Sequence, residues 1–148
     1  MELLEFPKSE LWNKRNEWIE SEIVSAEKGV HLVSEHAASL FIDLQACYCI
    51  GAWLGVIILS VSVIDAHLRE NEAMDNNIGT AKLLNDYYEG SKEDINWLRY
   101  LRNKYVHIDI DNPALNLNIQ FDERDKLEKN ATKAMKIVID TLFQNPGV

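Results

Sequence analysis

The sequence is poor in the residues that break or bend a chain. Its 148 residues include only six glycines and three prolines, too few for a sandwich with many tight turns, a collagen-like repeat or a linker-rich assembly. Four tryptophans and five tyrosines argue against disorder, because a disordered chain lacks the apolar surface to form a core. The composition is typical of one soluble globular domain, residues 1–148, built mainly from helices.

Positive charge is also scarce. Fifteen lysines and arginines stand against 24 aspartates and glutamates, which gives a formal net charge of −9 at pH 7. Such a field repels nucleic acid and anionic membranes. Any binding of nucleic acid must therefore take place at a small local site.

Cysteine and metal-ligating patterns are sparse as well. Cys47 and Cys49 provide neither a disulfide framework nor two ligand pairs for zinc, so we expect both to be reduced packing residues. His31, His36 and His67 show no metal-site spacing with Cys, Asp or Glu, and we expect no metal or other cofactor. The chain begins without a basic segment before an apolar stretch, which predicts no signal peptide and a cytoplasmic location.

One uncharged run, residues 44–64, leaves a membrane span as an alternative. Gly51 and Gly55 in this run have the spacing of small residues seen in membrane helix dimers. However, Asp43 and Asp65 bracket the run, and no cluster of Lys or Arg marks a cytoplasmic side. We therefore favour a buried helix and expect no contact with a membrane.

Apolar residues at helical spacing predict four substantial helices and one short one. The first is a long amphipathic helix over residues 9–44, capped by Ser9 and followed by a turn at 45–51. The second covers residues 52–72 and is apolar on most sides, and a short helix at 81–88 is closed by Gly90.

Two further helices complete the prediction. Ser91 and Asp94 form a capping box that starts a helix ending near residue 107. After a loop at 108–120, Asp122 caps the last helix, whose apolar stripe is Leu127, Ala131, Ala134, Val138 and Leu142. The predicted fold class is all-α, an up-and-down four-helix bundle with an additional short helix.

The helix predicted at residues 92–107 carries the side chains best suited to chemistry. At about 100° per residue, Ile95, Leu98 and Val106 share one face with Arg102 in their midst. Because a buried guanidinium needs a partner, we expect either an internal carboxylate or an anionic ligand there. Asp65 lies on the core-facing stripe of its helix and is the expected carboxylate, although it could instead pair with Arg69, four residues on.

His107 ends the same helix. Asn103 precedes it by four residues, so the amide could hold the imidazole in one orientation. Arg102 and His107 are about 140° out of phase on an ideal helix, and they converge only if the helix ends near His107 or a second copy faces the first. Taken alone, His107 could simply be a histidine at the negative end of the helix dipole.

The segment Arg102-Asn103-Lys104-Tyr105-Val106-His107 resembles the Arg-x4-6-His motif, in its Arg-Asn form, of the HEPN superfamily. The apolar helix that ends in Asp65-Ala66-His67-Leu68-Arg69 resembles the family helix with an acidic or polar residue before a small residue and Leu-Arg. Residues 79–84 resemble the short segment that precedes the motif helix. The similarity spans about residues 51–107.

The resemblance implies a helical bundle that forms a homodimer, unites two Arg/His pairs in one cleft and cleaves RNA without metal. It implies that His107 acts as general acid and base and that Arg102 stabilises the charge on the phosphorane. Asn103 would orient His107 or contact the phosphate, and Asp65 would hold Arg102 in place.

Arg99, Lys104 and Tyr105 are the expected RNA-binding residues. Arg99 and Lys104 make this helix locally basic despite the net charge, and Tyr105 could stack on a base or belong to the core. The resemblance implies a toxin or defence ribonuclease, a hydrolase that acts on RNA. It also implies a cognate antitoxin, which in this family is often of the minimal nucleotidyltransferase type. The alternative is a non-catalytic HEPN module that dimerises and binds a nucleotide, RNA or a protein.

Overall fold

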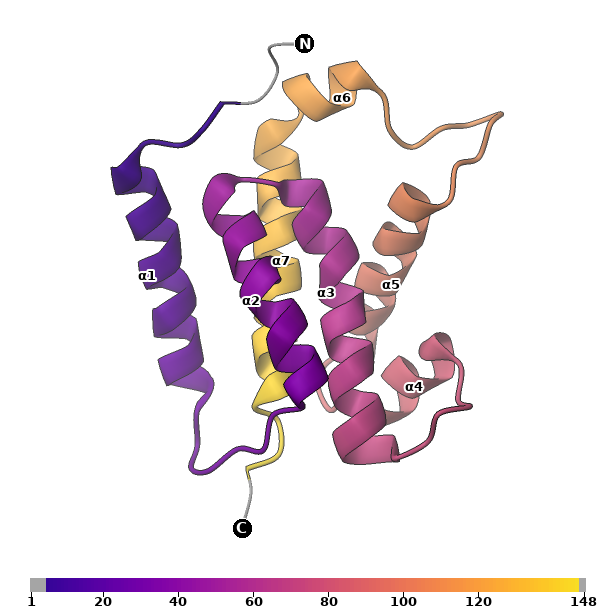
Figure 1. Cartoon of the computed structure of the whole chain (residues 1–148). Coiled ribbons are helices and arrows are strands. Elements are labelled where there is room, and N and C mark those ends of the chain that lie inside the picture. The colour runs from indigo at the N-terminus through magenta and orange to yellow at the C-terminus, as the bar shows by residue number, and fades with distance from the viewer. Residues whose placement is uncertain (1–4, 147–148) are drawn as a thin grey trace.

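The computed structural model describes residues 5–146, and every regular element within them is a helix (Figure 1). Successive long helices run in opposite directions, as predicted for an up-and-down arrangement (Figure 1). The helices are α1 (Ser9–Ala26), α2 (Glu35–Ile50), α3 (Trp53–Leu68), α4 (Thr80–Tyr87), α5 (Lys92–Val106), α6 (Leu117–Asp122) and α7 (Arg124–Leu142), with a π-helical turn, η1 (Arg69–Ala73), directly after α3.

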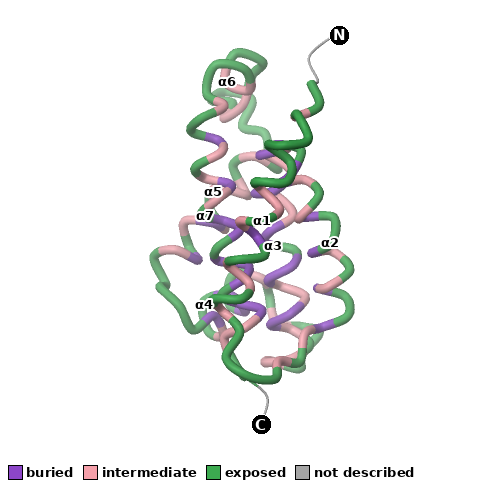
Figure 2. Tube along the Cα trace, turned by 90° about the vertical axis from the view of Figure 1, so that its left-hand side faces the viewer, coloured by how far each residue is buried: buried purple, intermediate pink, exposed green. Residues whose placement is uncertain are grey.

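Helix α3 is the centre of the core. It contacts α2, α7, α5 and α4, and in Figure 1 it lies between α2 and α5 with α7 behind. Figure 2 shows the buried segments gathered inside the bundle. The apolar residues of α3 point in several directions because several neighbouring helices cover α3. This confirms the prediction of a buried central helix. The fully or almost fully buried residues of α3 are Trp53, Val56, Ile57, Ser60, Val61, Val63, Ile64, His67 and Leu68.

The prediction of one helix over residues 9–44 is wrong. The chain leaves helical conformation after Ala26 and begins α2 at Glu35. Gly29 has φ +122°, which favours glycine, and Ser34 caps α2 by accepting a hydrogen bond from the Ala37 amide at 3.1 Å. The apolar period continues across this break and so conceals it. Lys8, rather than Ser9, stands at the start of α1 and provides no side-chain cap.

The turn between α2 and α3 is shorter than predicted. Helix α2 continues through residues 45–50, and Gly51, with φ +81°, ends it. The bundle in the described residues therefore has five long helices, where four were predicted.

The two cysteines lie in α2 and are free thiols, as predicted, and burial raises the pKa of both.

The later helices follow the prediction more closely. Ser91 caps α5 and accepts a hydrogen bond from the Asp94 amide at 3.2 Å. The predicted loop at 108–120 contains the start of α6, which Asn116 caps. Asp122 was predicted to cap the last helix, but it is the final residue of α6, and Glu123 precedes α7. All five residues of the predicted α7 stripe are buried. Helix α4 ends at Tyr87, and the capping residue after it is Tyr88, whereas Gly90 was predicted to close the helix.

No helix among residues 5–146 has the length and apolar content needed to cross a membrane. Residues 1–4, on which the prediction of no signal peptide partly rests, lie outside the described residues.

Two arginines bind the carbonyls at the α2–α3 turn. Arg15 of α1 donates to the Cys49 carbonyl at 3.0 Å, and its guanidinium lies 4.8 Å from the centre of the Trp53 ring. Arg124 of α7 donates to the Gly51 carbonyl. Carbonyls at a helix C-terminus lack partners within the helix and carry the negative end of its dipole. These contacts connect α1 and α7 to the turn.

Arg15→Ala is expected to lower the free energy of unfolding by about 1–3 kcal/mol, because it removes a charge-assisted hydrogen bond and the packing on Trp53. Urea unfolding followed by circular dichroism measures this. Lys14→Ala, at the exposed neighbouring position of α1, is the control and should change stability little. Equal stabilities of the two variants would contradict the role of Arg15.

Candidate functional site

The Arg/His motif begins in the last turn and a half of α5, and its histidine is the first residue after the helix. Helix α5 ends at Val106, and His107 follows in extended conformation while its backbone N–H donates to the Asn103 carbonyl at 3.0 Å. The His107 side chain is exposed. Arg102 and His107 were predicted to converge under either of two conditions, and one of them, a helix that ends near His107, is met.

The predicted core face of α5 is only partly buried. Ile95 and Leu98 are fully buried, but Val106 is 42% exposed, so its assignment to the core was wrong. Figure 1 shows the reason, since α5 diverges from α3 toward its C-terminal end. Arg102 is half-buried, and its Nε atom is buried with no hydrogen-bond partner among the described residues.

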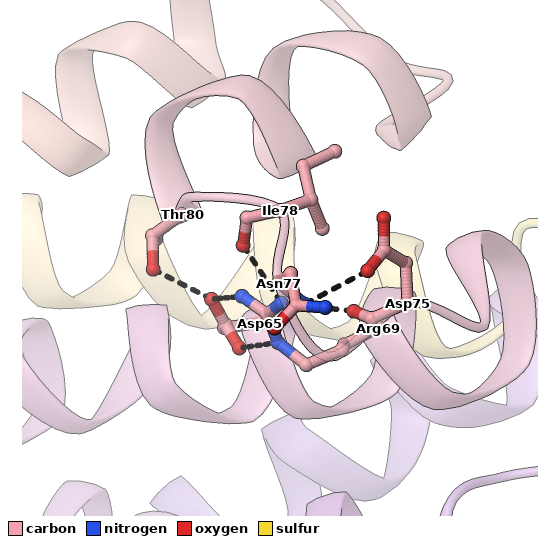
Figure 3. Close-up of polar contacts among 6 residues, drawn as sticks. All are labelled: Asp65, Arg69, Asp75, Asn77, Ile78 and Thr80. Carbon is pink, nitrogen blue, oxygen red and sulfur yellow. Dashed lines mark hydrogen bonds and ion pairs between the residues drawn. The ribbon is translucent and has the colours of Figure 1, made fainter.

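Asp65 is bound by Arg69, the second of the two partners considered (Figure 3). Arg69 donates from Nε to Oδ1 and from Nη2 to Oδ2, both at 3.0 Å, and Thr80 donates to Oδ2 at 2.7 Å. The expected ion pair between Asp65 and Arg102 does not form, because Arg69 occupies the carboxylate from the next turn of the same stretch of helix. A bidentate pair of this kind is strong and directional.

The positive charge of Arg102 nevertheless affects the pKa of Asp65. Burial on its own would raise the pKa of Asp65. The hydrogen bonds from Arg69 and Thr80, together with the charges of Arg69 and Arg102, outweigh burial and lower the pKa below its ordinary value of 3.8. Asp65 is therefore a carboxylate with its bonds to Arg69 and Thr80 made, and Arg102 is a nearby cation with no ion-pair partner among the described residues.

Arg69 also holds the loop between η1 and α4. Its Nη1 atom donates to the carbonyls of Asp75 at 3.0 Å and Ile78 at 2.7 Å (Figure 3). The Asp75 carboxylate in turn accepts a hydrogen bond from the backbone N–H of Asn77 at 2.8 Å. One guanidinium thus connects α3, the loop and the start of α4.

A pocket of about 680 Å³ lies beside this network. Asp65, Arg69 and Thr80 form part of its wall, and Arg102 is the residue that α5 contributes, whereas His107 does not line it. Its volume is within the range of small-molecule sites. The other lining residues are His36, Leu40, Val61, Ser62, Ala66, Glu70, Met74, Asp75 and Asn76.

The three predicted RNA-binding residues differ in exposure. Arg99 is half-buried, and its Nε atom, like that of Arg102, has no partner among the described residues. Lys104 is exposed and lies 5.9 Å from the centre of the Tyr100 ring. Tyr105 is half-buried against the core, which raises its pKa, while Tyr100 is 66% exposed.

Sequence reasoning missed the pocket residues of α2 and of the loop. His36 and Leu40 lie on a segment that was assigned to the first long helix, and their place on the lining of the same pocket as Arg102 has no local signal in the sequence. Met74 has φ +50°, a left-handed conformation unusual for a residue other than glycine. Asp75 and Asn76 lie between the helices predicted at residues 52–72 and 81–88, where the sequence pattern gave no sign of a pocket.

Comparison with protein-family models, with curated proteins and with solved structures finds no match for this chain. In the described part of the chain, no group of three His, Cys, Asp or Glu side chains is placed to hold a metal ion. The HEPN resemblance stays a prediction that rests on the motif and on the order of the helices around it.

Asp65→Asn is expected to lower the free energy of unfolding by about 1–3 kcal/mol near neutral pH, since it weakens charge-assisted hydrogen bonds. The lowered pKa of Asp65 means that this contribution is full above the ordinary value of 3.8 and is lost as pH falls through the lower folded value. Urea unfolding at neutral and acidic pH should therefore show a difference between wild type and variant that shrinks in acid.

Asp43→Asn is the matched control, because Asp43 is an exposed helical carboxylate without an ion pair to any described residue. It should alter stability little at either pH. A difference for Asp65→Asn that stayed constant down to strongly acidic pH would show that the network does not stabilise the charged carboxylate.

Proposed function

We propose that this protein is a metal-independent endoribonuclease of the HEPN type that acts as a homodimer. The observation that carries the proposal is the position of Arg102, which has a buried Nε without a partner among the described residues. It lies five residues before His107, the residue that directly follows the end of α5. A cation left without a carboxylate suits a phosphate, and a histidine on the same segment supplies a group that can move protons once the two are brought together.

The reaction uses the 2′-hydroxyl of the RNA itself. His107 acts as the base that takes the proton of the 2′-hydroxyl, whose oxygen attacks the phosphorus and forms the phosphorane. Arg102 stabilises the negative charge on that phosphorane. The bond to the 5′-oxygen then breaks, and a protonated His107 returns a proton to it, which leaves a cyclic phosphate and a free 5′-hydroxyl. Asn103 orients the imidazole or contacts the phosphate.

A second copy of the chain completes the site. Within one protomer Arg102 lines the pocket and His107 does not. We therefore expect a facing copy of the chain to bring Arg102 and His107 together in one cleft. Exposed apolar side chains adjoin His107, since Val106, Ile108 and Ile110 are 42%, 78% and 84% exposed. Exposed apolar clusters of this kind favour an interface, and here it would lie at the C-terminal end of α5.

Local charge supports RNA binding at this place. Arg99 and Arg102 are three residues apart on α5 and therefore neighbours on its surface, and Lys104 adds a third positive charge. Two copies of the chain carry twice −9, or −18. RNA is then held at the cleft and repelled elsewhere. Such a ribonuclease suits a cytoplasmic toxin or defence system with a cognate antitoxin, of the minimal nucleotidyltransferase type in this family.

The second candidate is a non-catalytic HEPN module that dimerises and binds a nucleotide, RNA or a protein. The exposure of His107 and its position outside the pocket favour this alternative. In that case the protein binds without cutting.

Wild-type protein in excess EDTA is expected to cut RNA internally, and both Arg102→Ala and His107→Ala should lose cleavage by about 100-fold or more. The assay follows the fragments of a labelled RNA over time. Lys126→Ala, at an exposed position of α7, is the control and should cut at the wild-type rate. Intact RNA with the wild type, or unimpaired cutting by either motif variant, would overturn the mechanism. Slower host growth that His107→Ala relieves is a second readout.

Val106→Glu is expected to weaken the dimer and reduce RNA cleavage, because it places a charge in the proposed interface. Light scattering coupled to size exclusion should give twice 17.0 kDa for the wild type and a lower mass for the variant. Val24→Glu, at a 69% exposed valine of α1, is the matched control. A strictly monomeric wild type would contradict the composite site.

A further inference from the structure

The pocket beside the Asp65–Arg69 pair has a lining of uneven chemistry. Leu40, Val61 and Met74 present apolar side chains, while Arg102, Asp75 and Asn76 present polar ones. Along α3 the lining runs from Val61 to the first residue after the helix, Arg69, a rise of about 12 Å at 1.5 Å per residue. This suits an elongated ligand with both an apolar and a polar part.

The pocket is formed before any ligand binds. Arg69 fixes the loop through the Asp75 and Ile78 carbonyls, and the Asp75 carboxylate accepts from the Asn77 amide. Met74 is held in a left-handed conformation, which costs energy and occurs often at functional sites. A preorganised wall reduces the entropy lost on binding.

The charges of the pocket select the groups of the ligand. Arg102 offers a cation whose Nε has no partner among the described residues, and it suits a phosphate. Asp65 is already bound to Arg69 and Thr80. Asp75 and Glu70 add negative charge on the lining, and a carboxylate accepts hydrogen bonds from N–H donors.

A nucleotide has these groups in this combination: an anionic phosphate, a flat base with apolar faces, and polar edges. We propose that the pocket binds one base of the RNA substrate next to the phosphate held by Arg102, and that it prefers bases with an exocyclic amino group over uracil. The amino group donates a hydrogen bond to the Asp75 carboxylate. The side-chain amide of Asn76 forms a hydrogen bond with the neighbouring edge of the base. The inference rests on the proposed function, which places the phosphate at Arg102.

The first test is the binding of adenosine, cytidine, guanosine and uridine 5′-monophosphates, with inorganic phosphate as the probe without a base. Calorimetry should give the three amino-bearing nucleotides an affinity at least about tenfold above those of phosphate and of uridine monophosphate. Chemical shifts of pocket amides should respond to these nucleotides. Four nucleotides that bind no better than phosphate would overturn the inference.

Two variants test the location. Ser62 is an exposed residue of α3 on the pocket lining, so Ser62→Trp should fill the pocket and weaken binding of the amino-bearing nucleotides by about tenfold or more. Ser21→Trp, at an exposed serine of α1, is the matched control and should bind as the wild type does. Wild-type binding by Ser62→Trp would place the nucleotides elsewhere.

Asp75→Asn tests the preference for the amino group. Asn retains an oxygen for the Asn77 amide, so the loop should persist, while the preference over uridine monophosphate should fall by about fivefold. Asp109→Asn is the control, because Asp109 also accepts backbone amides, from Asp111 and Asn112, in an exposed loop. An unchanged preference in Asp75→Asn would refute the assigned role of this carboxylate.

These measurements separate the pocket from the ribonuclease. If wild-type protein cuts RNA and Ser62→Trp cuts with unchanged KM and kcat, the pocket inference fails and the ribonuclease stands. If the nucleotides bind with the expected preference and no RNA is cut, the ribonuclease fails and the pocket remains a nucleotide site.

Discussion

The bidentate bond between Arg69 and Asp65 determines where the groups around Arg102 lie. It joins the last turn of α3 to η1, and through Thr80 and the loop carbonyls it fixes the entry of α4. Helix α5 follows α4 and packs against both α4 and α3, and it contributes Arg102 to the pocket that Asp65 and Arg69 line. Because Arg69 and Thr80 satisfy the carboxylate, Arg102 is left as a cation close to Asp65 without being paired to it. The ion pair between Asp65 and Arg69 thus leaves the positive charge of Arg102 available to bind an anion.

The fold was predicted well where local signals agree, and poorly where they conflict. The Ser91 cap and the apolar stripe of α7 indicate the same helices that the structure contains. Over residues 9–44 the apolar period indicated one helix, although Gly29 and Ser34 were present as signs of a break. Tertiary packing decided between these signals, since α1 and α2 pack against each other across the connection.

The site was predictable to a similar degree. Periodicity placed Asp65 toward the interior and Arg102 near it, and both residues line the same pocket. It could not choose the partner of Asp65, because Arg69 and Arg102 both fit and the choice depends on the distance between α3 and α5. Val106 shows the same limit, since its exposure follows from the divergence of α5 from α3. The contribution of α2 and of the loop to the pocket has no local signature at all.

Under the proposed function, the acidic composition constrains how this protein would recognise RNA, because it excludes a general attraction of nucleic acid. A chain of charge −9 with a few basic residues on one helix can neutralise only a few phosphates, so electrostatics supplies limited affinity. The remaining affinity must then come from contacts that act at short range, such as a base in a preformed pocket. Short-range contacts depend on the shape and edges of the base, whereas phosphate contacts do not. A scarcity of positive charge therefore favours selective recognition of RNA over tight recognition of any RNA.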